Sequence, residues 1–265
     1  MMTITLYDQL PDVLRKACIG LDLEPAAVAS KLGWNLAQLR RQLDARLPEV
    51  PLDELASATG LSAEGLRALG GDRPFPELPA WVERLELPFE DETVNAWRLS
   101  HDGFSLLVDA GLHGRDLLAA LHGRVPGRVL ITHPHRDHVG GLAALPSEIP
   151  NSSPKAPARL EAGPFEITVH DLAGHHPRAV GYELRLASSA EETVFLSGDA
   201  IFASSMGGCP DAGVFQTACG TIARAIRQLP EDTLILPGHG SATRVALERR
   251  YNPFFPCWER AGLTP

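Results

Sequence analysis

Long apolar runs are missing from the sequence: no stretch approaches the roughly 18 consecutive apolar residues that a membrane-spanning helix needs. Cysteine is also scarce, because only four occur, scattered without paired spacing at positions 18, 209, 219 and 257. Residues 1–10 lack the apolar core of a secretory signal and already carry the acidic Asp8. We therefore expect no membrane span and no disulfide framework, and free thiols in a reducing cytoplasm.

Basic residues are in deficit as well. The chain has 24 Lys+Arg against 33 Asp+Glu, and the resulting net charge of -9 opposes non-specific attraction to nucleic-acid phosphates. With 44% hydrophobic and 22% charged residues, the composition is that of a soluble globular protein, and 265 residues suffice for one large or two modest domains. We therefore expect a small-molecule partner, not nucleic acid or a membrane.

The densest chemical signal follows an apolar run at residues 129–131, which predicts a short buried strand. This run leads into four potential metal ligands within six residues: His133, His135, Asp137 and His138. Where a strand ends, positions two apart face the same way, so His133 and His135 can address one ion. The chain must then turn, which aims Asp137 and His138 at a second point nearby. Imidazole and carboxylate ligands suit Zn, Fe(II) or Mn(II).

Further ligands are needed, because four side chains cannot fill two coordination spheres. Three later segments supply them, each an apolar or alternating strand followed by an acid or a histidine. Residues 165–171 precede His175, residues 193–198 precede Asp199, and residues 233–237 precede His239. Three further strands that each deliver one ligand at the carboxyl end would be hard to obtain by accident.

Together with Asp109 in the run Leu-Val-Asp-Ala-Gly at 107–111, these motifs resemble, in order, the five motifs of the metallo-β-lactamase superfamily over about residues 82–255. The resemblance implies an α/β fold, an αββα sandwich with metals at one sheet edge. It also implies the ligands position by position: His133, His135 and His175 on one metal; Asp137, His138 and His239 on the other; Asp199 bridging; and Asp109 orienting ligands without binding.

Within that superfamily, Asp199 stands where the commonest zinc β-lactamases carry Cys, which disfavours penicillin hydrolysis. Asp199 and residues 247–253 look like the glyoxalase II (hydroxyacylglutathione hydrolase) and persulfide dioxygenase branch, whereas residues 175–178, His-His-Pro-Arg, depart from its His-Thr-x-Gly pattern.

The resemblance implies two divalent ions, Zn with Fe or Mn as alternatives. Two ions that share a bridge lower the pKa of bound water to about 7 or below. The bridging hydroxide would cleave a thioester or ester, with Asp137 and His138 as catalytic residues and Asp137 accepting or passing a proton.

Other interpretations stay open at this point. His176 and Arg178, beside the ligand His175, are candidates to bind a substrate carboxylate, for which Arg is well suited, and a solvated loop is the alternative. A mononuclear iron enzyme of the persulfide dioxygenase type could use His133 and His135 in a facial set of ligands. A DNA-binding or metal-sensing regulator that has lost catalysis is the third function class.

Residues 1–72 differ from the rest because they predict only short amphipathic helices. These lie at residues 14–19, 25–32, 36–43, 52–59 and 63–69. The pattern is similar to the helix-turn-helix domain of phage Cro-type repressors. However, Pro25 stands where that family commonly has a DNA-gripping Gln, and residues 1–76 hold eight basic against ten acidic residues.

We therefore expect the helical domain at residues 1–72 to cover the active-site side of the molecule or to mediate homodimerisation, not to bind DNA. Residues 73–80, rich in proline, predict a linker. The catalytic domain is expected to occupy residues 81–265.

Overall fold

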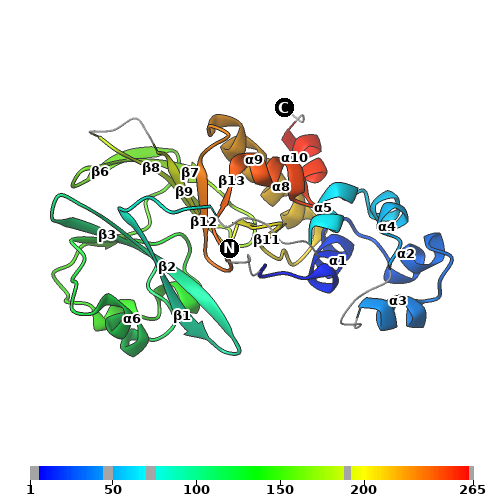
Figure 1. Cartoon of the computed structure of the whole chain (residues 1–265), viewed down its shortest axis with the longest axis horizontal. Helices are drawn as coiled ribbons and strands as arrows, with labels where there is room; N and C mark the ends of the chain where they lie inside the picture. The colour runs from blue at the N-terminus through cyan, green and yellow to red at the C-terminus, as the bar shows by residue number, and fades with distance from the viewer. Residues whose placement is uncertain (1–5, 44–49, 70–75, 188–191, 263–265) are drawn as a thin grey trace.

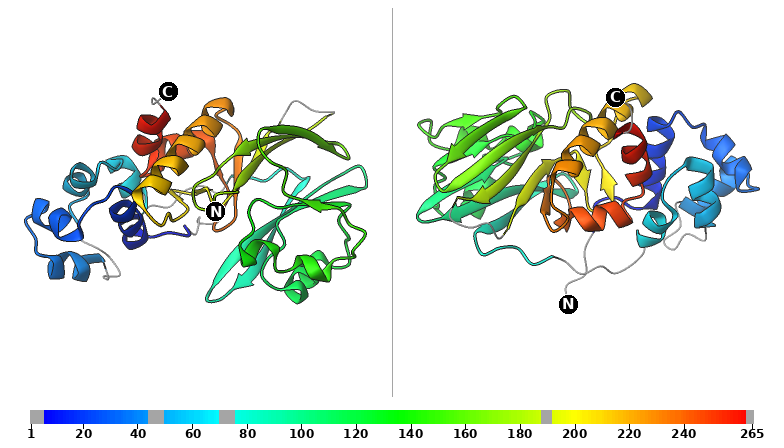
Figure 2. Two further views of the ribbon diagram at one scale, coloured as in Figure 1. Left: turned by 180° about the vertical axis from the view of Figure 1, so that it is seen from behind. Right: turned by 90° about the horizontal axis from the view of Figure 1, so that it is seen from above.

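The computed structural model describes residues 6–43, 50–69, 76–187 and 192–262. Two β-sheets face each other, and helices cover both outer faces of the pair (Figure 1). The N-terminal helices lie at the end of the molecule away from α6 (Gly114–Leu121), as the views in Figure 2 also show.

The first sheet has five strands in the order β1-β2-β3-β4-β5. Their bounds are β1 (Val82–Phe89), β2 (Glu92–His101), β3 (Phe104–Val108), β4 (Arg128–Leu130) and β5 (Asn151–Ser152). The first three form an antiparallel meander, while β4 runs parallel to β3 because α6 carries the chain back between them. The carboxyl ends of β3 and β4 therefore meet at the same edge.

The second sheet has six strands in the order β13-β12-β9-β8-β7-β6. Their bounds are β6 (Ala158–Ala162), β7 (Phe165–Asp171), β8 (Val180–Leu186), β9 (Val194–Gly198), β12 (Leu234–Pro237) and β13 (Thr243–Arg244). Strands β9 and β12 are parallel, since α8 (Ala212–Gln228) crosses between them. A small hairpin of β10 (Ile201–Phe202) and β11 (Ser205–Met206) follows β9.

Side chains that alternate along each strand divide the core into layers. Leu106 and Leu196 belong to the core between the sheets, whereas their neighbours Leu107 and Phe195 pack toward the helices. Each is fully buried, and burying a side chain of this size contributes about 1.5–3 kcal/mol. The four layers of helix, sheet, sheet and helix confirm the predicted αββα sandwich.

Five helices precede the sandwich within residues 6–43 and 50–69, as predicted. They are α1 (Leu10–Gly20), α2 (Pro25–Lys31), α3 (Leu36–Leu43), α4 (Leu52–Thr59) and α5 (Ala63–Ala68). Ser62 caps α5 by accepting a hydrogen bond from the backbone N–H of Gly65, and Gly60 ends α4 at φ +72°. The resemblance to Cro-type repressors stays a prediction.

The N-terminal helices share one apolar core with the C-terminal ones, α8, α9 (Val245–Tyr251) and α10 (Phe255–Gly262). Gly20 lies so close to Phe215 that a Cβ atom there would be 2.3 Å from the ring, and the Ser62 N–H donates to the Pro253 carbonyl at 2.8 Å. Residues 70–75, which include the start of the predicted linker, lie outside the described residues. The predicted boundaries at 72 and 81 stay predictions.

All four cysteines are free, as their spacing predicts. Burial raises the pKa of the Cys219 and Cys257 thiols, which therefore behave as small apolar side chains of the core. In the described part of the chain, no helix is long and apolar enough to cross a membrane.

Candidate metal centre

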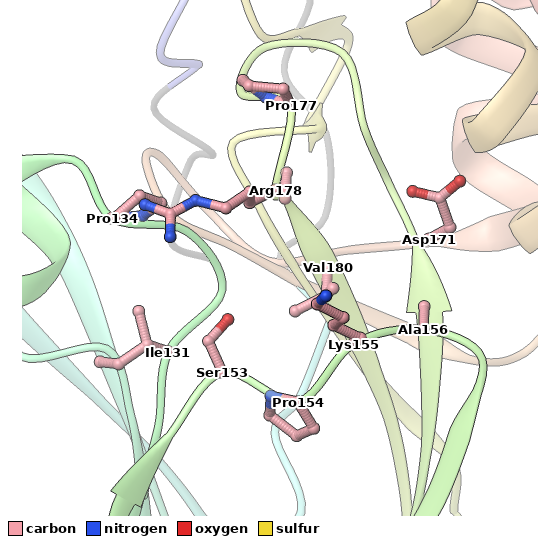
Figure 3. A pocket seen from close by; sticks show the side chains of 11 residues that line it. Ile131, Pro134, Ser153, Pro154, Lys155, Ala156, Asp171, Pro177, Arg178 and Val180 are labelled. Atoms are coloured by element: carbon pink, nitrogen blue, oxygen red, sulfur yellow. The ribbon is translucent and has the colours of Figure 1, made fainter.

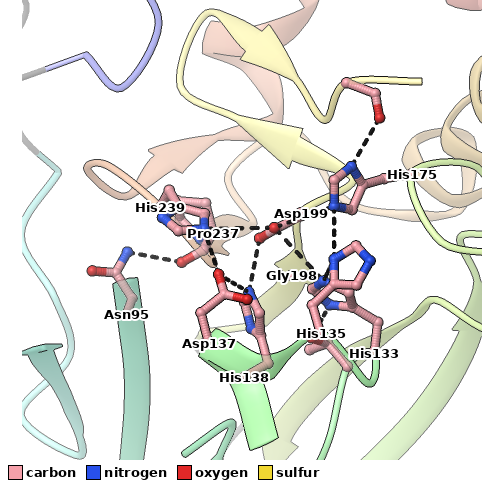
Figure 4. Close-up of polar contacts among 12 residues, drawn as sticks. Asn95, His133, His135, Asp137, His138, His175, Gly198, Asp199, Pro237 and His239 are labelled. Atoms are coloured by element: carbon pink, nitrogen blue, oxygen red, sulfur yellow. Dashed lines mark hydrogen bonds and ion pairs between the residues drawn. The ribbon is translucent and has the colours of Figure 1, made fainter. Parts of the chain in front are cut away.

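Seven side chains from four separate segments meet beyond the ends of the central strands (Figure 4). The segment after β4 supplies four of them, two from its extended start and two from the short helix α7 (Arg136–Val139). The segments after β7, β9 and β12 supply one each. The seven are His133, His135, Asp137, His138, His175, Asp199 and His239. The structure thus brings together every predicted ligand.

The first group consists of His133, His135, His175 and Asp199. His135 points Nδ1 into the group, 3.0 Å from His133 Nε2 and 3.1 Å from His175 Nε2. Asp199 Oδ2 lies 3.6 Å from the Nε2 atoms of both His133 and His175. Because all four ligand atoms lie within 4.8 Å of one another, they can surround a single cation.

The second group consists of Asp137, His138, His239 and again Asp199. Asp137 Oδ2 lies 3.5 Å from His138 Nε2 and 3.3 Å from His239 Nε2. The Asp199 carboxylate is shared between the groups, since Oδ1 lies 3.3 Å from His138 Nε2 and Oδ2 lies 3.5 Å from His239 Nε2. One carboxylate therefore stands where two neighbouring cations would meet.

Two buried atoms of the second group support occupancy by an ion. His138 Nε2 and Asp199 Oδ1 are both inaccessible and find no hydrogen-bond partner among the described residues. A buried polar atom without a partner costs about 1–3 kcal/mol, and more when it is charged. A cation between the two atoms would satisfy both, so the residues fit a metal ion.

A set of outer hydrogen bonds fixes the imidazole rings. The other ring nitrogen, Nδ1, of His175 contacts the Gly208 carbonyl at 2.8 Å, and Nδ1 of His239 contacts the Thr93 carbonyl at 2.8 Å. Nδ1 of His138 contacts Asp109 Oδ2 at 2.8 Å. Each contact fixes the ring nitrogen that faces the centre, which is how metal-binding histidines are commonly oriented.

Known proteins match this chain in both sequence and structure. The family model "Metallo-beta-lactamase superfamily" matches residues 90–183. A "Probable metallo-hydrolase YqgX" of Bacillus subtilis is 27% identical over a match 205 residues long, which covers 63% of this chain and 95% of that protein. A hydroxyacylglutathione hydrolase of Polaromonas sp. is 30% identical over 52% of this chain, but the match spans only 57% of that enzyme.

A solved structure, "Crystal structure of BLEG-1 B3 metallo-beta-lactamase", superposes with a TM-score of 0.53 at 24% identity and covers 66% of this chain and 99% of that one. The chain has the metallo-β-lactamase fold. The family model over residues 90–183 and the sequence relatives support the metallo-β-lactamase superfamily.

Electrostatics in this metallo-β-lactamase fold prepare the centre for cations. Burial raises the pKa of Asp199, but His138 and His239 outweigh burial and hold that pKa well below its usual range. Burial lowers the pKa of His133 to about 2, with a further contribution from His138. Asp199 is therefore ionised and His133 neutral at physiological pH, and these are the forms in which the two residues bind metals.

The backbone passes too close to the centre to admit side chains at two glycines. A Cβ atom on Gly238 would lie 2.1 Å from Asp199 Oδ1 and 2.7 Å from His138 Cε1. One on Gly207 would lie 2.0 Å from the Asp199 carbonyl oxygen. Glycine at these positions lets the segments after β11 and β12 pack directly against the ligands.

A cavity of about 350 Å³ lies next to the centre, at the open edge between the sheets (Figure 3). Its wall includes Pro134, which stands between two ligands, and the Arg178 side chain extends toward that proline. Lys155 adds a second cation and Asp171 an acid, while Ile131 contributes to the apolar wall. The cavity thus offers positive charge beside apolar surface, close to His135.

His176 has a different place from Arg178. It is not among the residues that line this cavity, and its Nδ1 accepts a hydrogen bond from the backbone N–H of Arg178 at 3.0 Å. Burial, followed by the charges of His135 and Arg178, lowers the pKa of His176, which suits a neutral acceptor. His176 closes the turn from which Arg178 projects.

Sequence reasoning missed several groups that hold the centre. Gly208 and Thr93 act through backbone carbonyls, which every residue carries, so no residue type marks them. Asn95 donates to the carbonyls of Pro237 and Gly240 at 2.9 Å, on either side of His239. Asn95 lies inside the strand β2, where its residue type alone does not mark these contacts.

Proposed function

We propose that the chain is a metal-dependent hydrolase that holds two divalent ions and cleaves a thioester or an ester bond. The observation that carries the proposal is the pair of four-residue groups that share Asp199. Both contain only imidazole and carboxylate donors, which suit zinc, with iron or manganese as alternatives. The hydrolase relatives support the same class of reaction.

The ligand assignment follows the two groups. In the first, His133 and His175 would bind through Nε2, and His135 through Nδ1. In the second, His138 and His239 would bind through Nε2 and Asp137 through a carboxylate oxygen. Asp199 would belong to both. Asp109 would not bind, because its oxygens are used by Thr132 and His138.

When bound, the two ions supply a water activated as a nucleophile at neutral pH and positive charge for the developing oxyanion. The chain supplies orientation and proton transfer. Burial raises the pKa of Asp137, but His239 and His138 outweigh it and lower that pKa, so Asp137 is a carboxylate that can accept a proton. His138, which Asp109 orients, would hold the second ion beside Asp137. A thioester or ester suits this centre because its leaving group needs little assistance.

The substrate would extend from the centre into the neighbouring cavity. Arg178 and Lys155 there can bind a carboxylate of the substrate, and the guanidinium can do so through two parallel hydrogen bonds. The apolar wall would contact the adjoining carbon chain. His176 contributes by holding the turn that carries Arg178.

Metal quantitation on the purified chain, followed by a panel of thioesters that includes lactoylglutathione, tests the proposal. We expect two zinc equivalents per chain and turnover of at least one thioester, lost on chelation. One iron per chain with oxygen consumption would favour the dioxygenase alternative, for which the first group alone suffices. Two bound metals without turnover of any ester or thioester would contradict the proposed reaction.

A further inference from the structure

The segment that precedes α1 lies directly against the proposed metal centre. The ring of Tyr7 stacks on His239, with 4.6 Å between ring centroids and 19° between planes. The edge of the Phe202 ring supports Tyr7 from the side at 5.1 Å. A Cβ atom on Gly240 would lie 3.0 Å from Tyr7 Cβ, so the turn after His239 packs closely on the same residue.

This stack complements the hydrogen bond that His239 makes. The Thr93 carbonyl fixes Nδ1 of the ring, and Nε2 faces Asp137 and Asp199. The imidazole ring can still rotate about its Cα–Cβ and Cβ–Cγ bonds, and one hydrogen bond limits this rotation only in part. Tyr7, lying flat on one face, restricts that rotation and so holds Nε2 on the centre.

The same N-terminal segment reaches the other half of the centre through Lys16 on α1. Its ammonium donates to the Met206 carbonyl at 2.8 Å and pairs with Asp8. The Lys16 and Asp8 side chains are only 13% and 7% exposed. Two residues after Met206, the Gly208 carbonyl contacts Nδ1 of His175. Lys16 therefore anchors the turn that orients His175.

We propose that residues 6–20 are part of the metal centre, in which Tyr7 positions His239 and Lys16 positions His175. The residues matched by the family model begin at 90, so this contribution comes from outside the matched region. The inference rests on the two metal sites of the proposed function, but not on hydrolysis. It assigns the N-terminal segment a role in metal binding. Lys16 would support the first ligand group through His175, and Tyr7 would support the second through His239.

Titration of the metal-free protein with Co²⁺, followed by its visible absorption, tests the Tyr7 contact without any substrate. Tyr7→Leu keeps apolar bulk but removes the flat ring. We expect it to weaken one of two Co²⁺ equivalents by about 10- to 100-fold, the range seen when outer partners of metal ligands are lost. Tyr7→Phe, which keeps the ring, should bind both equivalents like the wild type.

Lys16 is tested with a matched pair of lysines. Lys16→Met is combined with Asp8→Asn, so that no buried charge is left unpaired. Lys31→Met is the control, because Lys31 also donates to a backbone carbonyl within the N-terminal helices, that of Ala58 at 3.3 Å, away from the centre. We expect the Asp8/Lys16 variant to weaken one Co²⁺ equivalent about 10-fold or more and Lys31→Met to weaken neither.

The outcomes separate this inference from the proposed function. The inference would be overturned if Tyr7→Leu and the Asp8/Lys16 variant both bound two Co²⁺ equivalents with the affinity of the wild type. Equal weakening of Co²⁺ binding in Tyr7→Phe and Tyr7→Leu would show that the stacked ring is not what positions His239. Failure of the wild type itself to bind Co²⁺ would instead overturn the proposed metal centre. Circular dichroism verifies folding, and Tyr7→Met replaces Tyr7→Leu if the leucine variant does not fold.

Discussion

The Asp109 carboxylate lies 2.8 Å from Nδ1 of His138, and both side chains are buried. Asp109 also accepts hydrogen bonds from the backbone N–H and the hydroxyl of Thr132, each at 2.8 Å. It holds these contacts from a left-handed backbone conformation, at φ +63°. The end of β3 is thereby tied to the start of the ligand-bearing segment, and His138 Nε2 is aimed at the centre.

Replacing Asp109 with Asn is expected to weaken metal binding and hydrolysis by about 10- to 100-fold. An amide has one oxygen, so its NH2 group would face either the Thr132 N–H or the donors of His138 and the Thr132 hydroxyl. Asn nevertheless tolerates the left-handed backbone. Asp102→Asn is the matched control, because Asp102 also has positive φ, +48°, on an exposed hairpin. Metal titration and steady-state rates measure the effect, and equal values for the two variants would contradict the role of Asp109.

Replacing Gly238 with Ala should disrupt the centre through the steric overlap of one added methyl group. The new Cβ atom would lie 2.1 Å from Asp199 Oδ1, so the shared carboxylate must move. We expect loss of at least one metal equivalent. Gly220→Ala is the control, because its Cβ atom meets nothing closer than 3.7 Å within α8. That helical substitution should stabilise the chain by about 0.5–1 kcal/mol in denaturant unfolding. Full metal content in Gly238→Ala would show that the glycine is dispensable.

Removal of metal should lower the stability of the whole chain. Ions that bind the folded state only add stability by mass action, about 4 kcal/mol when free ion is 1,000 times Kd. Without them, His138 Nε2 and Asp199 Oδ1 keep no hydrogen-bond partner among the described residues. The measurement is urea unfolding with zinc and with chelator. Coincident unfolding curves under the two conditions would argue against ions at this centre.

The ligands were predictable from sequence because each ligand-bearing segment follows an apolar or alternating strand. The parallel neighbours β9 and β12 bring Asp199 and His239 to one edge of the second sheet. His133 follows β4 in the facing sheet, and it reaches them because the two sheets pack together. The backbone acceptors, such as the Gly208 carbonyl, were not predictable. Their identity depends on where a turn packs, and no residue type encodes it.

The N-terminal part shows a different limit. Its five helices were predicted, but α1 begins at Leu10 and not at residue 14, because the Asp12 carboxylate accepts the Gln9 N–H at 3.1 Å and caps an earlier turn. We expected this part to cover the active-site side, and one of its residues, Tyr7, contacts His239. That contact follows from the docking of α1 on α8, which helical periodicity alone does not determine. Homodimerisation stays a prediction.

Glu83 predicts a pH dependence of stability. It pairs with Arg98 at 3.0 Å and with Arg124 at 2.8 Å, joining β1 to β2 and to the end of α6. Burial raises its pKa, but the two arginines outweigh burial and lower it. The pairing therefore stabilises the fold fully above the unfolded pKa of about 4.3 and loses that effect as pH falls through the folded pKa.

The stability difference between wild type and Glu83→Gln should accordingly be constant near neutral pH and shrink below about pH 4. Unfolding of the metal-free proteins as a function of pH measures this difference, and using metal-free protein keeps metal release out of the comparison. Glu161→Gln, at an exposed position of β6, is the control. A difference that grows on acidification would contradict the assigned direction of the pKa shift.

Arg178 should determine affinity for carboxylate-bearing substrates without taking part in bond cleavage. It lines the cavity beside Pro134 and does not belong to either ligand group, so its removal leaves the metals in place. A hydrogen bond to a charged group contributes about 1.5 kcal/mol or more, so Arg178→Ala is expected to raise KM about tenfold at unchanged kcat.

The control for this experiment is Arg185→Ala, which removes an exposed arginine that pairs with Glu166 on the neighbouring strand. Comparing two substrates that differ only by a carboxylate sharpens the result, because the KM effect of Arg178→Ala should vanish for the neutral one. Arg178→Lys should give an intermediate KM, since an ammonium keeps the charge but loses the two-pronged geometry. An unchanged KM for the carboxylate-bearing substrate would mean that this cavity does not receive it.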